Sequence, residues 1–188
     1  MGRPLNDDEW WQFFTEIEYT AFRLELQPEY RVADEQESFQ RFLAGEPAMP
    51  EDVDGGDEWF SLVRDLTKRG GRMERVRVQE DPPTDYQRWE RAWGRWNAEA
   101  GERIWYITRQ QAHDVGLLPA AGNVDWWLFD SHKLVQMHFD SDGNRGRTEL
   151  VSDPDAVVRA NVWRDTALYH AQRIGTLGTV EEVREQAG

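Results

Sequence analysis

The sequence predicts an α+β fold with five to six mostly antiparallel strands, a C-terminal three-strand meander, and amphipathic helices flanking the sheet. Three observations predict it. Apolar residues recur at helical spacing behind capping residues, and between these segments they alternate at every second position. The apolar runs 124–130, 133–139 and 146–151 have joins too short for a crossover helix. A chain of 188 residues suits a single domain, expected at 1–175 with a tail at 176–188 that has room for a short helix.

The first third of the chain predicts three helices and a strand. Asn6 and Glu9 form a capping-box pattern ahead of the first helix, and residues 21–27 alternate as a half-buried strand. Asp34 with Glu37 predicts a second capping box, and Asp57 is the expected N-cap of a third helix. The acidic segment between these two helices, 45–56, is rich in Gly and Pro and indicates a loop.

The middle and end of the chain continue this alternation. Residues 72–80 predict a strand with a basic second face, and Thr84 begins a longer helix with a stripe of tryptophans. That stripe favours core packing, with the wall of a binding cleft as the alternative. A strand at 103–108 and a short helix at 109–116 follow, and Asp153 with Pro154 begins the last helix, whose apolar stripe is expected to reach Ile174.

The segment 138–149 has the length and several oxygen ligands of a calcium-binding loop. His138 replaces the carboxylate of position 1, Arg145 replaces the apolar residue of position 8, and both flanks read as strands. We therefore expect a hairpin turn at Gly143 and no metal site. Nucleophile-elbow, phosphate-loop and dinucleotide motifs are absent, so we predict no catalytic residue and no cofactor.

Charge and composition narrow the class of partner. The formal net charge is -14, and residues 6–58 hold 16 Asp or Glu against 3 Lys or Arg, which disfavours direct nucleic-acid binding. The sequence contains no cysteine, no apolar run of membrane-span length and no recognisable signal peptide, so we expect a cytoplasmic protein without a membrane association.

The best local constellation for a ligand lies on the predicted strand 72–80 and the helix after it. Arg75 and Arg77 share one strand face, and Tyr86, Arg88 and Glu90 follow on the helix. A pair of arginines can bind a carboxylate or phosphate bidentately. The alternative is that these arginines bond Asp85, Glu90 or the acidic N-terminal third, and the sequence leaves both open.

Several segments agree in order with an actinobacterial family catalogued as a domain of unknown function. They are AFRLELQPEY, RFLAGEP, RVRVQEDPPTDYQRWE, WWLFDSHKLVQMHFDSDG, TELVSDP and WRDTALYHA. The chain resembles this family over roughly residues 8–175, and the resemblance implies genes encoded beside helix-turn-helix regulators. The stretch from 126 is also similar to ligand domains of bacterial regulators related to phospholipase D, but His132 and Lys133 are adjacent where that signature spaces His, Lys and Asp as HxKxxxxD.

Two functional hypotheses follow. The first is a non-catalytic regulatory or interaction module whose acidic surface docks a basic protein, such as a DNA-binding regulator. The second is a sensor of a small anionic ligand, or a degenerate phospholipase-D-like enzyme, with the ligand at Arg75, Arg77 and Arg88 beside aromatic walls. The sequence does not determine the oligomeric state.

Overall fold

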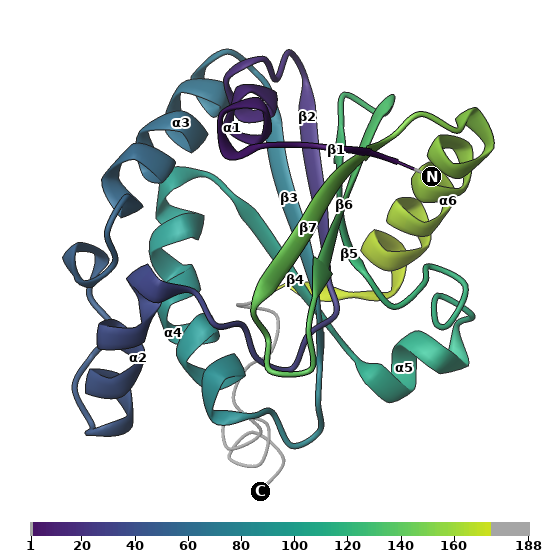
Figure 1. Ribbon diagram of the computed structural model, residues 1–188. Helices are drawn as coiled ribbons and strands as arrows, with labels where there is room; N and C mark the ends of the chain where they lie inside the picture. Colours follow the sequence, from purple (N-terminus) through teal and green to yellow (C-terminus); the bar gives the residue numbers. More distant parts are fainter. Residues whose placement is uncertain (1, 174–188) are drawn as a thin grey trace, which may run out of the picture.

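A computed structural model describes residues 2–173, which form one eight-stranded sheet with helices on both faces (Figure 1). The strands are β1 (Arg3–Pro4), β2 (Thr20–Glu25), β3 (Arg72–Gln79), β4 (Arg103–Thr108), β5 (Asp125–Phe129), β6 (Lys133–Phe139), β7 (Arg145–Val151) and β8 (Gln172–Arg173). The helices are α1 (Asp7–Thr15), α2 (Gln36–Leu43), α3 (Gly56–Lys68), α4 (Asp85–Ala100), α5 (Arg109–Asp114) and α6 (Pro154–His170). Two 3-10 turns, η1 (Ala33–Glu35) and η2 (Pro50–Asp52), lie on either side of α2.

The strand order is β1-β7-β6-β5-β2-β3-β4-β8, and all neighbours are antiparallel except β2–β3 and β3–β4. A mostly antiparallel sheet is therefore confirmed, whereas the predicted strand count was too low. The parallel pairs arise because α3 and α4 carry the chain back to the same end of the sheet between strands. Strands β5, β6 and β7 pair consecutively, but the sheet continues beyond them on both sides, through β1 and through β2.

Both faces of the central strands are buried. Phe22, Leu24 and Leu26 pack with α6 residues in one core, while Ala21 belongs to the opposite core with α1 and α3. Strand β2 was expected to be half-buried with a solvated polar face, but Glu25 on that face is only 3% exposed. The polar face lies under helices that the alternation pattern of the strand could not reveal.

The N-terminal ends of the helices show which of the predicted N-caps are present in the structure. Asn6, Thr84 and Asp153 each accept a backbone N–H bond as N-caps, as predicted. The capping box at Asp34 was wrong, because η1 precedes α2 and no side chain caps it. Asp57 is not an N-cap either, since Gly55 takes that position with a φ of 75° and α3 begins one residue before Asp57.

The β6–β7 hairpin is fastened to the segment that follows β2. Gly143 has a φ of 82°, and a Cβ there would lie 2.7 Å from the carbonyl oxygen of Glu29. The Arg31 N–H donates to the Gly143 carbonyl at 2.8 Å, and Asp140 accepts the N–H groups of Asp142 and Asn144. The prediction of a turn between two strands is confirmed, and the turn positions one wall of the site described below.

The last helix ends at His170 and residues Gln172–Arg173 form β8, so the predicted extension of its helical stripe toward Ile174 was wrong. The predicted tail at 176–188 lies outside the described residues. None of the helices in residues 2–173 combines the length and apolar character of a membrane span.

Candidate ligand-binding cavity

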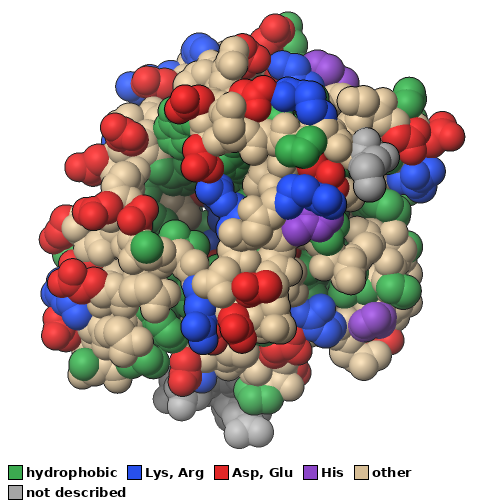
Figure 2. Space-filling view, in the orientation of Figure 1, with side chains coloured by type: hydrophobic (Ala, Val, Ile, Leu, Met, Phe, Trp, Pro, Cys, Tyr) green, Lys and Arg blue, Asp and Glu red, His purple; other side chains and the backbone are tan. Residues whose placement is uncertain are grey.

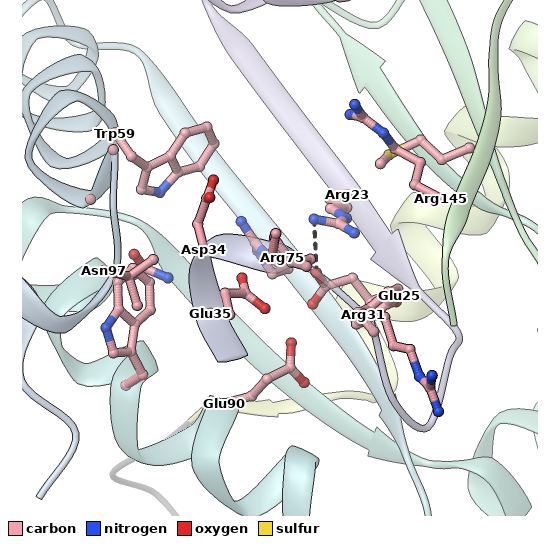
Figure 3. A pocket seen from close by; sticks show the side chains of 18 of the residues that line it. Arg23, Glu25, Arg31, Asp34, Glu35, Trp59, Arg75, Glu90, Asn97 and Arg145 are labelled. Atoms are coloured by element: carbon pink, nitrogen blue, oxygen red, sulfur yellow. Dashed lines mark hydrogen bonds and ion pairs between the residues drawn. The ribbon is translucent and has the colours of Figure 1, made fainter. Parts of the chain in front are cut away.

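A cavity of about 680 Å³ opens on the sheet face that carries α1, α3 and α4, and Figure 2 shows its hollowed mouth with basic side chains inside. Strands β2, β3 and β5 form its floor, η1 and the N-terminal end of α3 form part of its rim, and α4 forms a side wall. Arg77 is one of the polar residues that line the cavity. Figure 3 labels the other polar residues of the lining that matter for its chemistry: Arg23, Glu25, Arg31, Asp34, Glu35, Arg75, Glu90, Asn97 and Arg145.

Glu25 is the centre of the cavity floor. Its carboxylate contacts three guanidinium groups, with Arg23 Nη1 at 3.0 Å, Arg75 Nη1 at 2.8 Å and Arg77 Nε at 2.5 Å. Strand register explains the convergence, because Arg23 pairs with Arg75 and Glu25 with Arg77 across the parallel β2–β3 ladder. Alternate residues of two adjacent strands therefore face the same space.

Three further carboxyl groups complete the network. Arg75 Nε donates to Glu102 at 2.8 Å, Arg77 Nη2 lies 3.2 Å from Glu90, and Arg23 Nη2 lies 3.4 Å from Asp125. Asp125 also accepts the Leu26 N–H at 3.0 Å and the hydroxyl of Tyr30. The network thus contains three guanidiniums and four carboxyl groups, all on side chains that are buried or nearly so.

Burial raises the pKa values of these acids, whereas the neighbouring guanidinium groups lower them. Burial favours the neutral form of Glu25, but Arg23, Arg75 and Arg77 outweigh it and hold the pKa of Glu25 well below its usual range. For Glu90 burial wins over the attraction of Arg77 and raises its pKa to about 8. Burial also raises the pKa of Glu35, although the hydroxyl of Tyr86 donates a hydrogen bond to it. Of the acids in the network, Glu90 is therefore the one that burial most favours in its neutral form.

The charge count agrees with this protonation state. Burial also raises the pKa of Asp125, although Arg23 and the Tyr30 hydroxyl favour its carboxylate. With Glu25, Glu102 and Asp125 ionised, the three guanidiniums are balanced, and an ionised Glu90 would add an uncompensated negative charge inside the fold. Burying such a charge is costly unless it is neutralised by a proton or a cation. Arg31, Arg145 and Asp34 on the rim are exposed to solvent and screen the interior only weakly.

Aromatic rings form the upper and side walls. The guanidinium carbons of Arg23 and Arg75 both lie 5.7 Å from the Trp127 ring, and Arg75 lies 5.9 Å from Trp59. On α4, the Trp93 ring stacks on Phe60 at 5.4 Å. The tryptophan stripe of α4 therefore packs in the core as expected, and its members Trp89 and Trp93 also line the cavity.

Several polar atoms on the cavity lining lack a hydrogen-bond partner within residues 2–173. They are the Nε of Arg23, the Nε1 of Trp93 and Trp127, and the Oδ1 of Asn97. Trp127 and Asn97 are each 2% exposed, so their unmatched groups do not face bulk solvent. Because solvent does not reach these atoms through the open cavity, a bound molecule would satisfy them only together with small shifts of the surrounding side chains.

Four of the five candidate ligand-binding residues predicted from the sequence lie together in the cavity lining. Arg75, Arg77, Tyr86 and Glu90 line the cavity. Arg88 does not, because its side chain is exposed on α4, where it pairs with Asp85 and donates to the Pro83 carbonyl. Arg75 and Arg77 bond Glu25 and Glu90, which is the second sequence-based alternative, and they also line the cavity.

The sequence reasoning missed four members of the network. These residues are Arg23, Glu25, Glu102 and Asp125. The available signal was in the strand 21–27, where the alternate face carries Arg23 and Glu25 rather than uncharged polar residues. Glu102 and Asp125 sit at strand ends and carry no comparable pattern.

The histidines lie elsewhere. His132 is exposed in the β5–β6 turn and bonds the Asp130 carbonyl, and His138 Nε2 lies 2.9 Å from Glu149 on the neighbouring strand. Lys133 pairs with Glu16, away from the cavity lining. The described residues hold no group of three or more His, Asp or Glu side chains arranged for a metal ion.

A family described as a domain of unknown function, DUF6879, matches residues 8–176. The chain belongs to this family. No protein with a curated description matches it. Among solved structures, a phospholipase D family member, Nuc from Salmonella typhimurium, is similar at a TM-score of 0.47 and 8% identity, covering 88% of this chain and 90% of that one.

Proposed function

We propose that this DUF6879 protein is a small-molecule sensor whose ligand binds in the cavity over β2 and β3. The observation that carries the proposal is a cavity of about 680 Å³ whose lining combines aromatic rings with a converging arginine–carboxylate network. Ligand sites in proteins have volumes of roughly 300–1,000 Å³, mostly apolar walls and a few convergent polar groups. Tryptophan walls over an arginine–carboxylate floor fit that description.

A binding role without chemistry fits this site better than a phospholipase-D-like reaction. Such a reaction needs a histidine nucleophile, and the described histidines lie outside the cavity lining. The acids of the floor are held by arginines in fixed geometry, which suits recognition. Ligand binding would then change the position of the η1 segment, which contributes Asp34 and Glu35 to the rim.

The test is thermal-shift screening of a metabolite panel that spans neutral, cationic and anionic compounds. Ala33→Trp places a large side chain at the exposed rim, and Ala98→Trp makes the same change on an exposed α4 position outside the lining. We expect at least one compound to raise the melting temperature of the wild type and of Ala98→Trp, but not of Ala33→Trp. Stabilisation that persists in Ala33→Trp, or no stabilising compound at all, contradicts the proposal.

A second candidate function rests on the acidic surface in Figure 2, where Asp and Glu side chains gather over α2 and α3. Exposed acids in this region include Glu37, Glu46, Glu51, Asp54, Asp57, Glu58 and Asp65. We propose that this surface docks a basic protein, such as a helix-turn-helix regulator in the cytoplasm of an actinobacterium. Charge complementarity of this kind accelerates association and weakens with added salt.

Two versions of the chain would test this docking. Replacing Glu51, Asp54, Asp57 and Glu58 by their amides should abolish capture of a basic regulator encoded next to the gene. Replacing the exposed acids Asp155 and Asp165 of α6 removes charge from another element, leaves the Asp153 cap in place and should leave capture unchanged. Equal capture by both versions, or capture insensitive to salt, would argue against docking through α2 and α3.

A further inference from the structure

The ion network of the cavity contains one more acid than it has arginines to neutralise. Glu25, Glu102 and Asp125 are matched by Arg23, Arg75 and Arg77, and Glu90 is the remaining acid. Glu90 is 7% exposed and shares Arg77 with Glu25, whose contact is the shorter of the two. The network can be neutral in two ways: a proton on Glu90, or a positive charge placed beside it.

The groups around Glu90 do not supply that charge. Arg77 and Arg75 on β3 and Arg23 on β2 are already engaged by Glu25, Glu102 and Asp125. The other titratable groups that act on Glu90 are acids or phenols: Glu25 on β2, Tyr30 after it, Glu35 on η1, Tyr86 on α4 and Tyr106 on β4. An anionic ligand would add to the negative charge of this set.

The α4 wall presents acceptors on either side of an aromatic ring. Glu90, Trp93 and Asn97 lie on one helical face and all line the cavity. The Oδ1 of Asn97 is buried and has no partner within the described chain. Figure 3 shows Glu35 and Glu90 directed into the same part of the cavity. A group with several N–H donors could therefore bond Glu90 and, after a small side-chain shift, the Oδ1 of Asn97, while its body contacts Trp93.

We propose that the ligand of this cavity is an organic monocation with N–H donors and a planar or apolar body, and that it binds by replacing the proton on Glu90. This rests on the proposed ligand-binding function and specifies its ligand class. The exchange is balanced: the neutral Glu90 acid releases one proton to solvent, and the resulting carboxylate pairs with the incoming cation. It departs from the anionic ligand expected from Arg75 and Arg77 alone, because both arginines already face carboxylates.

Three planar probes of nearly equal size separate charge from shape: benzamidinium, benzamide and benzoate. Benzamidinium keeps its charge throughout the pH range of the experiment, so any pH dependence belongs to the protein. Since the pKa of Glu90 is about 8, the affinity for benzamidinium should rise roughly 50-fold between pH 6 and pH 8. At pH 8 we expect benzamidinium to bind at least tenfold more tightly than benzoate, by titration calorimetry.

Glu90→Gln is the decisive variant because it keeps the shape of the side chain and removes its charge. It should lose the preference for benzamidinium and the pH dependence, with an unchanged circular dichroism spectrum. Asn97→Leu should weaken benzamidinium but keep the pH dependence, since Glu90 remains. Glu99→Gln, on an exposed position of the same helix, should behave as the wild type.

Each outcome bears on one of the two proposals. Binding of benzoate as tight as that of benzamidinium, or an affinity for benzamidinium that is flat between pH 6 and pH 8, overturns the monocation inference. If benzamidinium does not bind at millimolar concentration while neutral or anionic compounds bind in the cavity, the inference fails and the sensor function stands. If no compound of any charge binds there, both fail.

Discussion

Arg77 holds Glu90 at both ends: its Nη2 lies 3.2 Å from the Glu90 carboxyl group, and its Nη1 donates to the backbone carbonyl of Glu90 at 3.1 Å. The same guanidinium bonds Glu25 through Nε at 2.5 Å. A single side chain from β3 therefore fixes the α4 wall relative to the cavity floor. The acid at position 90 is positioned by Arg77 but not fully neutralised by it.

The first prediction concerns the stability of Glu90→Gln as a function of pH. Glu90 keeps its proton up to about pH 8 in the folded protein, whereas the unfolded chain loses it near 4.5, so wild-type stability falls as pH rises between these values. Glutamine has no such penalty. The free energy of unfolding of Glu90→Gln minus that of the wild type should increase by roughly 2–4 kcal/mol from pH 5 to pH 8 in urea titrations. A difference independent of pH would show that Glu90 is ionised in the fold.

The second prediction concerns Glu25→Gln. This change leaves Arg23, Arg75 and Arg77 without their shared anion in a buried site. Breaking a buried ion pair from one side costs about 3–5 kcal/mol, and we expect a loss of that size in urea unfolding at pH 7. The exposed control Glu99→Gln should change stability by less than about 0.5 kcal/mol. A loss below about 1 kcal/mol for Glu25→Gln would mean that solvent reaches the network.

The third prediction concerns Gly143→Ala in the β6–β7 turn. Alanine there is strained by the φ of 82°, and its Cβ would also press on the Glu29 carbonyl, 2.7 Å away. Gly45→Ala is the matched control, since Gly45 has a φ of 89° with nothing near its Cβ position. We expect a loss of about 1 kcal/mol for Gly45→Ala from backbone strain and at least about 2 kcal/mol for Gly143→Ala. Equal melting-temperature shifts for the two variants would mean that the Glu29 segment moves away without cost.

The fourth prediction concerns Asp130, which caps the start of β2. Its carboxylate accepts the backbone N–H groups of Glu18, Tyr19 and Thr20. Burial alone would raise the pKa of Asp130, but these bonds hold it below its ordinary value, so its contribution is present above pH 3.8 and is lost as the pH falls through the folded-state pKa. Asp130→Ala should lose about 2 kcal/mol at pH 7 and less at pH 2. If Asp130→Ala lowers the free energy of unfolding equally at both pH values, its effect comes from the conformation of the turn and not from the charge of the carboxylate.

Local patterns predicted much of the fold. The capping residues Asn6, Thr84 and Asp153 operate as expected, because a cap is an interaction within a few residues of chain. The turn at Gly143 was predicted for the same reason. Asp34 and Asp57 show the limit of such patterns, since the same residue types precede helices that begin elsewhere.

The candidate site was predicted only where charged residues stood out along one strand. Arg75 and Arg77 were identified by their alternation, and Tyr86 and Glu90 by helical spacing. Arg88 was included because it is adjacent in sequence, yet the helix directs it to solvent. Arg23 and Glu25 were not identified, because residues 21–27 were predicted as a half-buried strand and a single strand does not show which helices cover its polar face.

The sequence by itself determined the six helices, the six longer strands, the hairpin turn and the acidic character, because these depend on neighbouring residues or on composition. Tertiary structure alone decided that β2 lies parallel to β3, which brings Arg23, Glu25, Arg75 and Arg77 to one surface. It also decided that Glu90 on α4 faces them without an arginine of its own. The physical reason is that the charge balance of a buried site depends on residues far apart in sequence, and only their packing determines which charges meet.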